Sequence, residues 1–343
     1  MATHIPSTQK ALEIVSFGDP LKGALRLNTT ASVPKPGPGQ VLVKMRYACL
    51  NPADVFVVQG VYPGVAAVRE RRPGFVGGLE GVGEVVAQGP ATSLPVGTRV
   101  IPTLLDRSGC WQQYLVVDEN LCIKVPQDIG DKEAAQLIVN PLTVVGMLEQ
   151  IEAEAPVHGN PWIGQTAANS TLGRMFIQLA KKRGLCTVNF VRSKASVAEL
   201  KQLGADEVIV FGEEPNLAER LNAITNGRGL AAVVDAVGGE MGSAALAALS
   251  PGGLFMAYGL QSGKPTCVMN SDLICKGIVV RGFSLTIWLK NQKPTIFEET
   301  FEMIRKGDMR PQVEQEYTLE QYEDAFRAQF APNRKGKILF KLE

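Results

Sequence analysis

The sequence predicts an α/β protein with two domains: a β-rich domain, then a parallel sheet covered by helices. The chain has 343 residues, and at about 100–200 residues per domain we expect two hydrophobic cores. Up to about residue 135, short apolar segments are separated by Gly and Pro. From about residue 160, strand-like and helix-like segments alternate instead, which is typical of a doubly wound parallel sheet.

The first strand of the β-rich part is expected at 40–46, where apolar and polar residues alternate as in a half-buried strand. It follows the turn-forming run 34–39, which is rich in Pro and Gly. Two further strands are expected at 81–87 and 111–117. Together these segments predict a small antiparallel, barrel-like domain.

The second half begins with a short strand at 162–165 and an amphipathic helix. Leu172, Met175, Phe176 and Leu179 recur at helical spacing, and Gly184 ends the helix. The rest of the alternation predicts strands at 185–191, 208–210, 231–237 and 253–258, with helices at 195–203, 217–224 and 241–249. A last strand is expected at 337–342.

Composition excludes several classes of protein. Lys and Arg total 35 and Asp and Glu total 34, so the net charge is +1 and no field favours nucleic acid or an anionic membrane. No apolar run approaches the ~18 residues of a membrane helix, and Asp235 interrupts one at 230–234. Neither a signal peptide nor an Arg-rich transit peptide is evident. We expect a cytoplasmic protein, or a mature organellar form.

Cysteine and histidine usage argues against a metal or disulfide framework. The six cysteines are widely spaced without a C-x-x-C pair, so we expect reduced, mostly buried thiols. The only histidines are His4 and His158. A histidine-based zinc site and a histidine-containing triad are therefore not expected.

The turn at 165–173 is the first candidate for cofactor binding. In a dinucleotide fold, a Gly-rich turn here would hold a pyrophosphate at the helix N-terminus. This turn has only Gly173, where helix and strand must approach closely, with Asn169 and Ser170 before it. Asn169 or Ser170 could simply cap the helix, so the turn alone leaves phosphate binding open.

The end of the next strand favours one cofactor. A residue that binds the ribose 2′-hydroxyl of NAD(H) at this position would be Asp or Glu. The chain instead has Arg192, Ser193 and Lys194. Two cations and a hydroxyl suit a 2′-phosphate. The alternative, a solvated charge pair, would oppose the dipole of the helix that follows. The sequence therefore favours NADP(H) over NAD(H).

Several motifs make the chain similar to a known family. Segments 51–54, 167–173 and 203–209 resemble the medium-chain dehydrogenase/reductases. Within that superfamily, the chain is most similar to the trans-2-enoyl-CoA or acyl-carrier-protein reductases of mitochondrial fatty-acid synthesis. This similarity is carried by segments 140–143 and 281–285, Val191-Arg192 and Trp288. The resemblance runs from about residue 11 to 341.

The resemblance implies two named folds. Residues 1–137 and 311–343 would form a GroES-like catalytic domain, and 138–310 a Rossmann domain that binds NADP(H). The family also implies a homodimer, to which strand 231–237 or strand 253–258 could contribute a sheet edge.

The resemblance also implies site residues. Tyr62 matches the proton donor and Asn140 a residue beside the nicotinamide, although Tyr62 could instead be a lid residue and Asn140 a helix cap. The implied cofactor contacts are Asn169, Ser170, Thr171, Leu172, Gly173, Arg192, Ser193, Lys194, Tyr258, Gly259, Leu260, Phe283, Ser284, Leu285 and Lys337.

Zinc-containing members of the superfamily use a Cys and a Gly-His-Glu as metal ligands. The matching positions here are Asn51 and Gly78-Leu79-Glu80, so no catalytic metal is expected. Polarisation by hydrogen bonds instead of a metal suits reduction of a conjugated C=C bond. The implied reaction adds a hydride to the β carbon of an enoyl thioester, and Tyr62 protonates the α carbon.

Three departures keep other functions open. Ser284 stands where the family has an aromatic residue, and Gly78 to Gly81 resembles quinone oxidoreductases. The longer loop carries Arg69, Arg71 and Arg72, which could be a solvated charge run or could meet the phosphates of CoA or a phosphopantetheine carrier. The alternatives are an NADPH-dependent quinone or enone reductase and a non-catalytic cofactor-binding protein.

Overall fold

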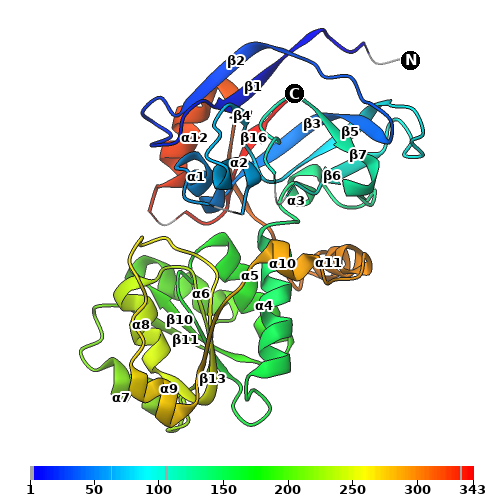
Figure 1. Cartoon of the computed structure of the whole chain (residues 1–343). Coiled ribbons are helices and arrows are strands. Elements are labelled where there is room, and N and C mark those ends of the chain that lie inside the picture. Colours follow the sequence, from blue (N-terminus) through cyan, green and yellow to red (C-terminus); the bar gives the residue numbers. More distant parts are fainter. Residues whose placement is uncertain (1–3, 63, 105–106, 333) are drawn as a thin grey trace. The chain divides into compact units, whose positions relative to one another are not determined.

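The computed structural model describes residues 4–62, 64–104, 107–332 and 334–343. The chain divides into two compact units (Figure 1). The first comprises Met1–Val139 together with Pro311–Glu343, and the second is Asn140–Arg310. The first unit is therefore discontinuous in sequence, and the last 33 residues of the chain complete it.

The first unit is built on two sheets. A seven-stranded sheet has the order β15-β16-β3-β5-β6-β8, with β7 also paired to β3, and a three-stranded sheet has the order β2-β1-β4. All pairs are antiparallel except β15 with β16. The strands are β1 (Thr8–Ile14), β2 (Leu25–Ser32), β3 (Gln40–Leu50), β4 (Phe75–Val76), β5 (Gly81–Gln88), β6 (Arg99–Pro102), β7 (Tyr114–Asp118), β8 (Cys122–Lys124), β15 (Val313–Tyr317) and β16 (Lys337–Lys341).

Strand β3 lies at the centre of the larger sheet. It extends past the predicted 40–46 to Leu50, and Val41, Leu42 and Val43 are all buried. The expected alternation is interrupted at Leu42, which is buried like its neighbours, whereas Lys44 and Arg46 are half-buried on either side of buried Met45. Strand β5 pairs along one edge of β3, while β7 and then β16 pair along the other. Strand β16 places Ile338 beside Leu50 and Lys341 beside Tyr47.

Helices of the first unit are short. They are α1 (Pro52–Val58), α2 (Ala66–Arg69), α3 (Asp131–Ala134) and α12 (Tyr322–Gln329), with 3-10 turns η1 (Glu119–Leu121) and η3 (Leu319–Gln321). The core centres on Trp111, whose ring meets Phe326 and Phe340 edge-on at centroid distances of 5.7 and 5.6 Å. Trp111 precedes β7, so the strand predicted from 111 begins three residues later at Tyr114.

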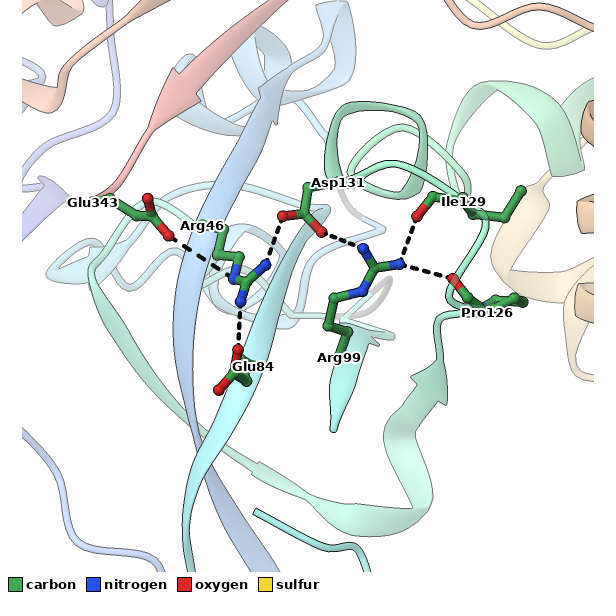
Figure 2. Close-up of polar contacts among 7 residues, drawn as sticks. All are labelled: Arg46, Glu84, Arg99, Pro126, Ile129, Asp131 and Glu343. Atoms are coloured by element: carbon green, nitrogen blue, oxygen red, sulfur yellow. Dashed lines mark hydrogen bonds and ion pairs between the residues drawn. The ribbon is translucent and has the colours of Figure 1, made fainter. Parts of the chain in front are cut away.

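An ion-pair network ties the segment before α3 to the larger sheet (Figure 2). Asp131 accepts from Arg46 of β3 at 2.8 Å and from Arg99 of β6 at 3.0 Å. Arg46 also pairs with Glu84 of β5. Arg99 donates to the carbonyls of two loop residues, Pro126 and Ile129, at 2.8 and 2.5 Å. The network fixes the course of the chain from residue 126 to α3.

The second unit is a six-stranded, wholly parallel sheet of order β11-β10-β9-β12-β13-β14. Helices flank it on both faces (Figure 1). The strands are β9 (Trp162–Gln165), β10 (Cys186–Val191), β11 (Glu207–Val210), β12 (Leu230–Asp235), β13 (Leu249–Ala257) and β14 (Val279–Gly282). The helices are α4 (Asn140–Glu154), α5 (Thr171–Lys182), η2 (Lys194–Ser196), α6 (Val197–Leu203), α7 (Leu217–Ile224), α8 (Gly239–Ala247), α9 (Asn270–Lys276), α10 (Leu285–Leu289) and α11 (Thr295–Arg305).

The topology confirms the predicted doubly wound sheet, whose strand order reverses between β9 and β12. It overturns two smaller expectations. Strands β12 and β13, proposed as a dimer edge, are interior, and the true edges are β11 and β14. The six cysteines are unpaired, but only Cys49 and Cys110 are fully buried. Among the described residues, no helix is long and apolar enough to cross a membrane.

Candidate functional site

The predicted cofactor residues of the second unit follow the carboxyl ends of neighbouring parallel strands. The turn 166–170 follows β9, 192–194 follows β10, 258–260 follows β13 and 283–285 follows β14. Carboxyl ends of parallel strands share one edge of a sheet, and ligands of such folds bind there, beside the reversal of strand order. Residues far apart in the sequence are thus gathered at one edge.

The turn after β9 is tight despite its lack of glycine. Ala167 has a φ of 51°, which non-glycine residues seldom adopt. Ser170 accepts a hydrogen bond from the Gly173 amide at 3.0 Å and caps α5, so the helix-cap interpretation is confirmed for Ser170. A Cβ on Gly173 would lie 2.6 Å from the Ala168 carbonyl oxygen. This close approach of helix to turn explains why a glycine is required there.

Gly173→Ala is expected to destabilise the second unit and to weaken NADPH binding. Alanine in an α-helix normally gains about 1 kcal/mol over glycine, but overpacking against fixed backbone costs about 1–3 kcal/mol. The control is Gly159→Ala, whose Cβ would meet nothing within 4 Å. A thermal melt in which Gly173→Ala is as stable as its control would contradict the packing argument.

The three residues after β10 differ in what they already contact. Ser193 accepts from the Ala195 amide at 3.2 Å, and Lys194 pairs with Glu213 at 2.8 Å in an exposed contact. Arg192 is exposed and makes no ion pair within the described parts of the chain. A surface pair such as Lys194 with Glu213 contributes little, so Arg192 is the cation most available to a phosphate.

Asp235, at the end of β12, has a part in the site that was not predicted from the sequence. Its carboxylate accepts from the Thr166 hydroxyl at 2.6 Å and from the amides of Val237 and Gly238, both at 3.0 Å. It therefore links the turns after β9 and β12. The Tyr258 hydroxyl is buried without a hydrogen-bond partner among the described residues. Burial, with the charge of Asp235, raises the pKa of Tyr258. The sequence does contain a signal for this role, because Asp235 is a carboxylate that ends the apolar run 230–234.

A cavity of about 430 Å³ opens beside the segment after β14. Its lining includes Phe283, Ser284 and Trp288, together with Glu149 of α4. Ser284 caps α10 by accepting from the Ile287 amide at 3.4 Å. The residue that departs from the family pattern thus lines a cavity within the range of small-molecule pockets.

Tyr62 lies in the first unit, just after α1. Gly60 turns the chain there with a φ of 73°, and its missing Cβ leaves room for the Phe17 ring, which a Cβ would approach to 2.7 Å. The Tyr62 ring packs partly buried against the core. Burial, and secondly the charge of Asp54, raises the pKa of Tyr62. The phenol is therefore protonated at neutral pH, as a proton donor must be.

The other predicted residues occupy the following positions in the two units. Asn140 is the first residue of α4 and is 6% exposed. Arg72 pairs with Glu70 in an exposed contact beyond α2, and Arg71 is also exposed. Thr171 and Leu172 open α5, Gly259 and Leu260 lie in the loop after β13, and Leu285 begins α10.

Lys337, expected at the cofactor, lies in a buried polar cluster of the first unit. Its ammonium donates to Asn51 Oδ1, and Asn51 Nδ2 donates to Glu80 Oε1 at 2.9 Å. Asp54 accepts from the amides of Asn51 and Leu79 at 2.8 and 3.0 Å. Burial raises the pKa of Asp54 to about 7 and also raises that of Glu80, whereas burial lowers the pKa of Lys337.

Comparisons with known proteins agree with this architecture. Residues 37–127 match the alcohol dehydrogenase GroES-like domain, and 171–304 match the zinc-binding dehydrogenase family. The mitochondrial enoyl-[acyl-carrier-protein] reductase of Rattus norvegicus is 35% identical over 95% of this chain and 87% of its own length. A quinone oxidoreductase structure from Pseudomonas syringae is 26% identical, with a TM-score of 0.85 over 97% of this chain and 100% of that one. A mycobacterial structure complexed with NADPH is 27% identical, with a TM-score of 0.83 over 97% and 100%.

A GroES-like unit joined to a Rossmann-type unit defines the medium-chain dehydrogenase/reductase class of oxidoreductases. The chain belongs to this superfamily and, within it, to the family of the mitochondrial enoyl-[acyl-carrier-protein] reductases. The resemblance found in the sequence motifs is confirmed, including its second-ranked likeness to quinone oxidoreductases.

The family model is described as zinc-binding, but the residues present here do not fit zinc. The expected ligand positions hold an amide, an alkyl chain and a carboxylate, namely Asn51, Leu79 and Glu80. The Asn51 oxygen already accepts from the Lys337 ammonium, and a second cation there would be repelled. In the described residues, no group of three or more His, Cys, Asp and Glu is arranged to hold a metal.

We expect the purified protein to contain less than stoichiometric zinc and to keep its full activity in a chelator. The reason is that zinc needs thiolate, imidazole or carboxylate ligands in a tetrahedral set. Elemental analysis on protein dialysed against a chelator makes the measurement. One zinc per chain, with activity lost on its removal and regained on its return, would overturn this interpretation.

Proposed function

We propose that the protein is an NADPH-dependent reductase of the C=C bond of 2-enoyl thioesters carried by CoA or an acyl carrier protein. The observation that carries the proposal is the 35% identity to an enoyl-[acyl-carrier-protein] reductase over 95% of the chain. The proposed role is in fatty-acid metabolism. When bound, NADPH supplies a hydride to the β carbon of the enoyl group.

The residues present fit this cofactor. Gly173 leaves the helix N-terminus close to the turn, and the buried Tyr258 hydroxyl has no partner among the described residues. Arg192, with Ser193 and Lys194, offers cations and a hydroxyl to a 2′-phosphate. The similar mycobacterial protein is complexed with NADPH in its structure, which supports the same choice here.

Tyr62 and Asn140 carry the proposed chemistry. The Tyr62 phenol holds its proton at neutral pH because burial and Asp54 disfavour the phenolate. It donates that proton to the α carbon as negative charge develops there. Asn140 orients a carboxamide or hydroxyl through its amide. With no metal ligands at Asn51 and Leu79, hydrogen bonds alone polarise the thioester carbonyl.

A quinone or enone reductase is the second candidate. The similarity to a Pseudomonas syringae quinone oxidoreductase, with a TM-score of 0.85, favours it. So does Ser284, a small side chain that lines the cavity beside α10. A third candidate is a cofactor-binding protein without catalysis, against which the Tyr62 position argues.

The test compares NADPH oxidation with crotonyl-CoA, a quinone and a simple enone under the same conditions. We expect the highest kcat/KM with crotonyl-CoA. A preference of ten-fold or more for the quinone or the enone would replace the proposal by the second candidate. NADPH binding with no turnover of any of the three would favour the third.

We also propose a homodimer formed through the edge strand β14. Val279 and Val280 on this strand are 47% and 44% exposed, and Ile274 on the adjacent α9 is 80% exposed. An uncovered edge with apolar side chains is a template for strand pairing. Sedimentation should give a dimer for the natural chain and a monomer for Val280→Glu; a monomeric natural chain would contradict this.

The relatives are named mitochondrial; for this chain we propose the cytoplasm or an organelle interior.

A further inference from the structure

A chain of hydrogen bonds runs through the buried cluster of the first unit. It begins at Lys337 Nζ, which donates to Asn51 Oδ1. Asn51 Nδ2 donates to Glu80 Oε1 at 2.9 Å, and the Val139 amide donates to Glu80 Oε2 at 2.8 Å. Lys337 is 2% exposed, and Asn51 and Glu80 are fully buried. Four segments distant in sequence are joined, and the last one ends next to Asn140.

Asn51, in the middle of this series of hydrogen bonds, has both the acceptor and the donor that its two neighbours require. An asparagine amide accepts at its oxygen and donates at its nitrogen, so it can stand between an ammonium and a carboxylate. Its orientation follows from its neighbours: the oxygen must face Lys337 and the nitrogen must face Glu80. A carboxylate at position 51 would instead face the charge of Glu80 at hydrogen-bond distance.

The charges of the cluster also require the lysine. Glu80 accepts two hydrogen bonds, one at each oxygen, and so does Asp54. Glu80 therefore accepts as an anion does, with little water around it, whereas burial raises the pKa of Asp54 to about 7 and leaves that carboxyl partly protonated at neutral pH. A buried anion with no counter-cation is strongly destabilising. Lys337 is the ammonium that contacts this cluster, and its attraction to Glu80 opposes the effect of burial on its pKa.

We propose that Lys337 is an internal counter-cation and a positioning residue. Through Asn51 and Glu80 it holds the backbone at Val139, and so fixes the residue that precedes Asn140. This role differs from the cofactor contact that the family resemblance implied for Lys337. It rests on residues of the first unit alone and not on the identity of the substrate.

The first experiment compares three variants of the full chain by thermal unfolding. Lys337→Met removes the charge while keeping the length of the side chain, and Tm is expected to fall by about 6–20 °C. Lys341→Met is the matched control, because Lys341 lies on the same strand with an exposed side chain; its Tm should be unchanged. A Lys337→Met variant as stable as the control would overturn the proposal.

The double variant Lys337→Met/Glu80→Gln separates a lost charge balance from lost packing. A buried ion pair can be replaced by neutral groups at little cost. The Asn51 amide can turn over so that its oxygen accepts from the new glutamine, whose own oxygen still accepts from Val139. We expect the double variant to regain most of the lost Tm and of the soluble yield. A double variant no more stable than Lys337→Met contradicts the proposal, also where the single variant fails to fold.

Chemical rescue gives a second, independent readout. Lys337→Ala leaves a space the size of n-propylammonium beside Asn51. Added n-propylammonium should raise the Tm of this variant, whereas n-propanol of the same shape and sodium ions should not. Equal effects of the amine and the alcohol would show that volume, and not charge, is what the cluster requires.

NADPH titration separates this role from a cofactor contact. If the lysine acts through Glu80, the double variant binds NADPH as the natural chain does. If the lysine contacts the cofactor, both variants lose the same affinity. The second result would overturn the positioning role while leaving the proposed reductase function intact.

Discussion

Replacing Tyr62 by Phe is expected to lower kcat for a 2-enoyl thioester about 10²–10⁴-fold, the usual contribution of general acid catalysis. The ring and its packing against the core are retained, so NADPH affinity and Tm should stay near those of the natural chain. The loss arises because no other group in the proposed scheme delivers a proton to the α carbon. Stopped-flow or steady-state rates, measured where chemistry limits turnover, make the comparison.

Two controls make this result specific. Tyr47→Phe removes a hydroxyl from a partly exposed tyrosine on β3 and should leave kcat unchanged. Quinone reduction, if present, should depend much less on Tyr62, because a quinone takes its protons on oxygen, which water supplies readily. An unaltered kcat of Tyr62→Phe on enoyl thioesters would demote Tyr62 to a lid residue and favour the quinone reductase.

Replacing Arg192 by Ala is expected to raise the KM for NADPH about ten- to hundred-fold, as for the loss of a charge-assisted hydrogen bond. The KM for NADH should hardly change, since NADH has no 2′-phosphate. Arg192 is exposed at the carboxyl end of β10, where it makes no ion pair with any described residue. It therefore loses no existing partner when a phosphate binds.

The neighbouring lysine provides the matched comparison. Lys194 already pairs with Glu213 at 2.8 Å, so Lys194→Ala should raise the KM for NADPH less than Arg192→Ala does. An equal loss with NADPH and NADH in the Arg192 variant would remove the assignment of Arg192 to the 2′-phosphate, because a general effect on folding would affect both cofactors.

Periodic segments were predictable from sequence. The apolar face starting at Leu172 predicted the α5 helix, and helices end near Gly184 and Gly204, which have φ values of 73° and 114°. Left-handed glycines end helices for steric reasons that depend only on local sequence. The alternation of strands and helices also depends on local pattern, and it suffices to define a doubly wound sheet.

Apart from the alternative of a helix cap at Asn140, helix α4 was not predicted, because it is buried almost all round. Residues 140–148 are all buried, so the segment shows no polar face and hence no helical period. The pairing partners of β3 were also not predictable. Its neighbours on both edges come from distant segments, and sequence periodicity carries no information about them.

The residues of the candidate site also divide into those that could be predicted from the sequence and those that could not. The cations at 192 and 194 were predictable from residue type after a predicted strand, whereas 258–260 and 283–285 were implied only by the family resemblance, and β14, which precedes 283–285, was not predicted as a strand. The partnership of Lys337 with Asn51 was not predictable, because 286 residues separate them. It depends on the register of β16 against β3, which pairs Ile338 with Leu50. Such a register is set by the whole sheet and not by either segment.

The discontinuity of the first unit has a consequence for synthesis on the ribosome. The second unit, Asn140–Arg310, is continuous and can fold as soon as it has emerged. The first unit cannot be completed then, since β15 and β16 follow the second unit in the sequence and β16 pairs between β15 and β3. Until Lys337 arrives, Glu80 lacks its cation. We therefore expect the second unit to finish folding before the first, although synthesis of the first unit begins earlier.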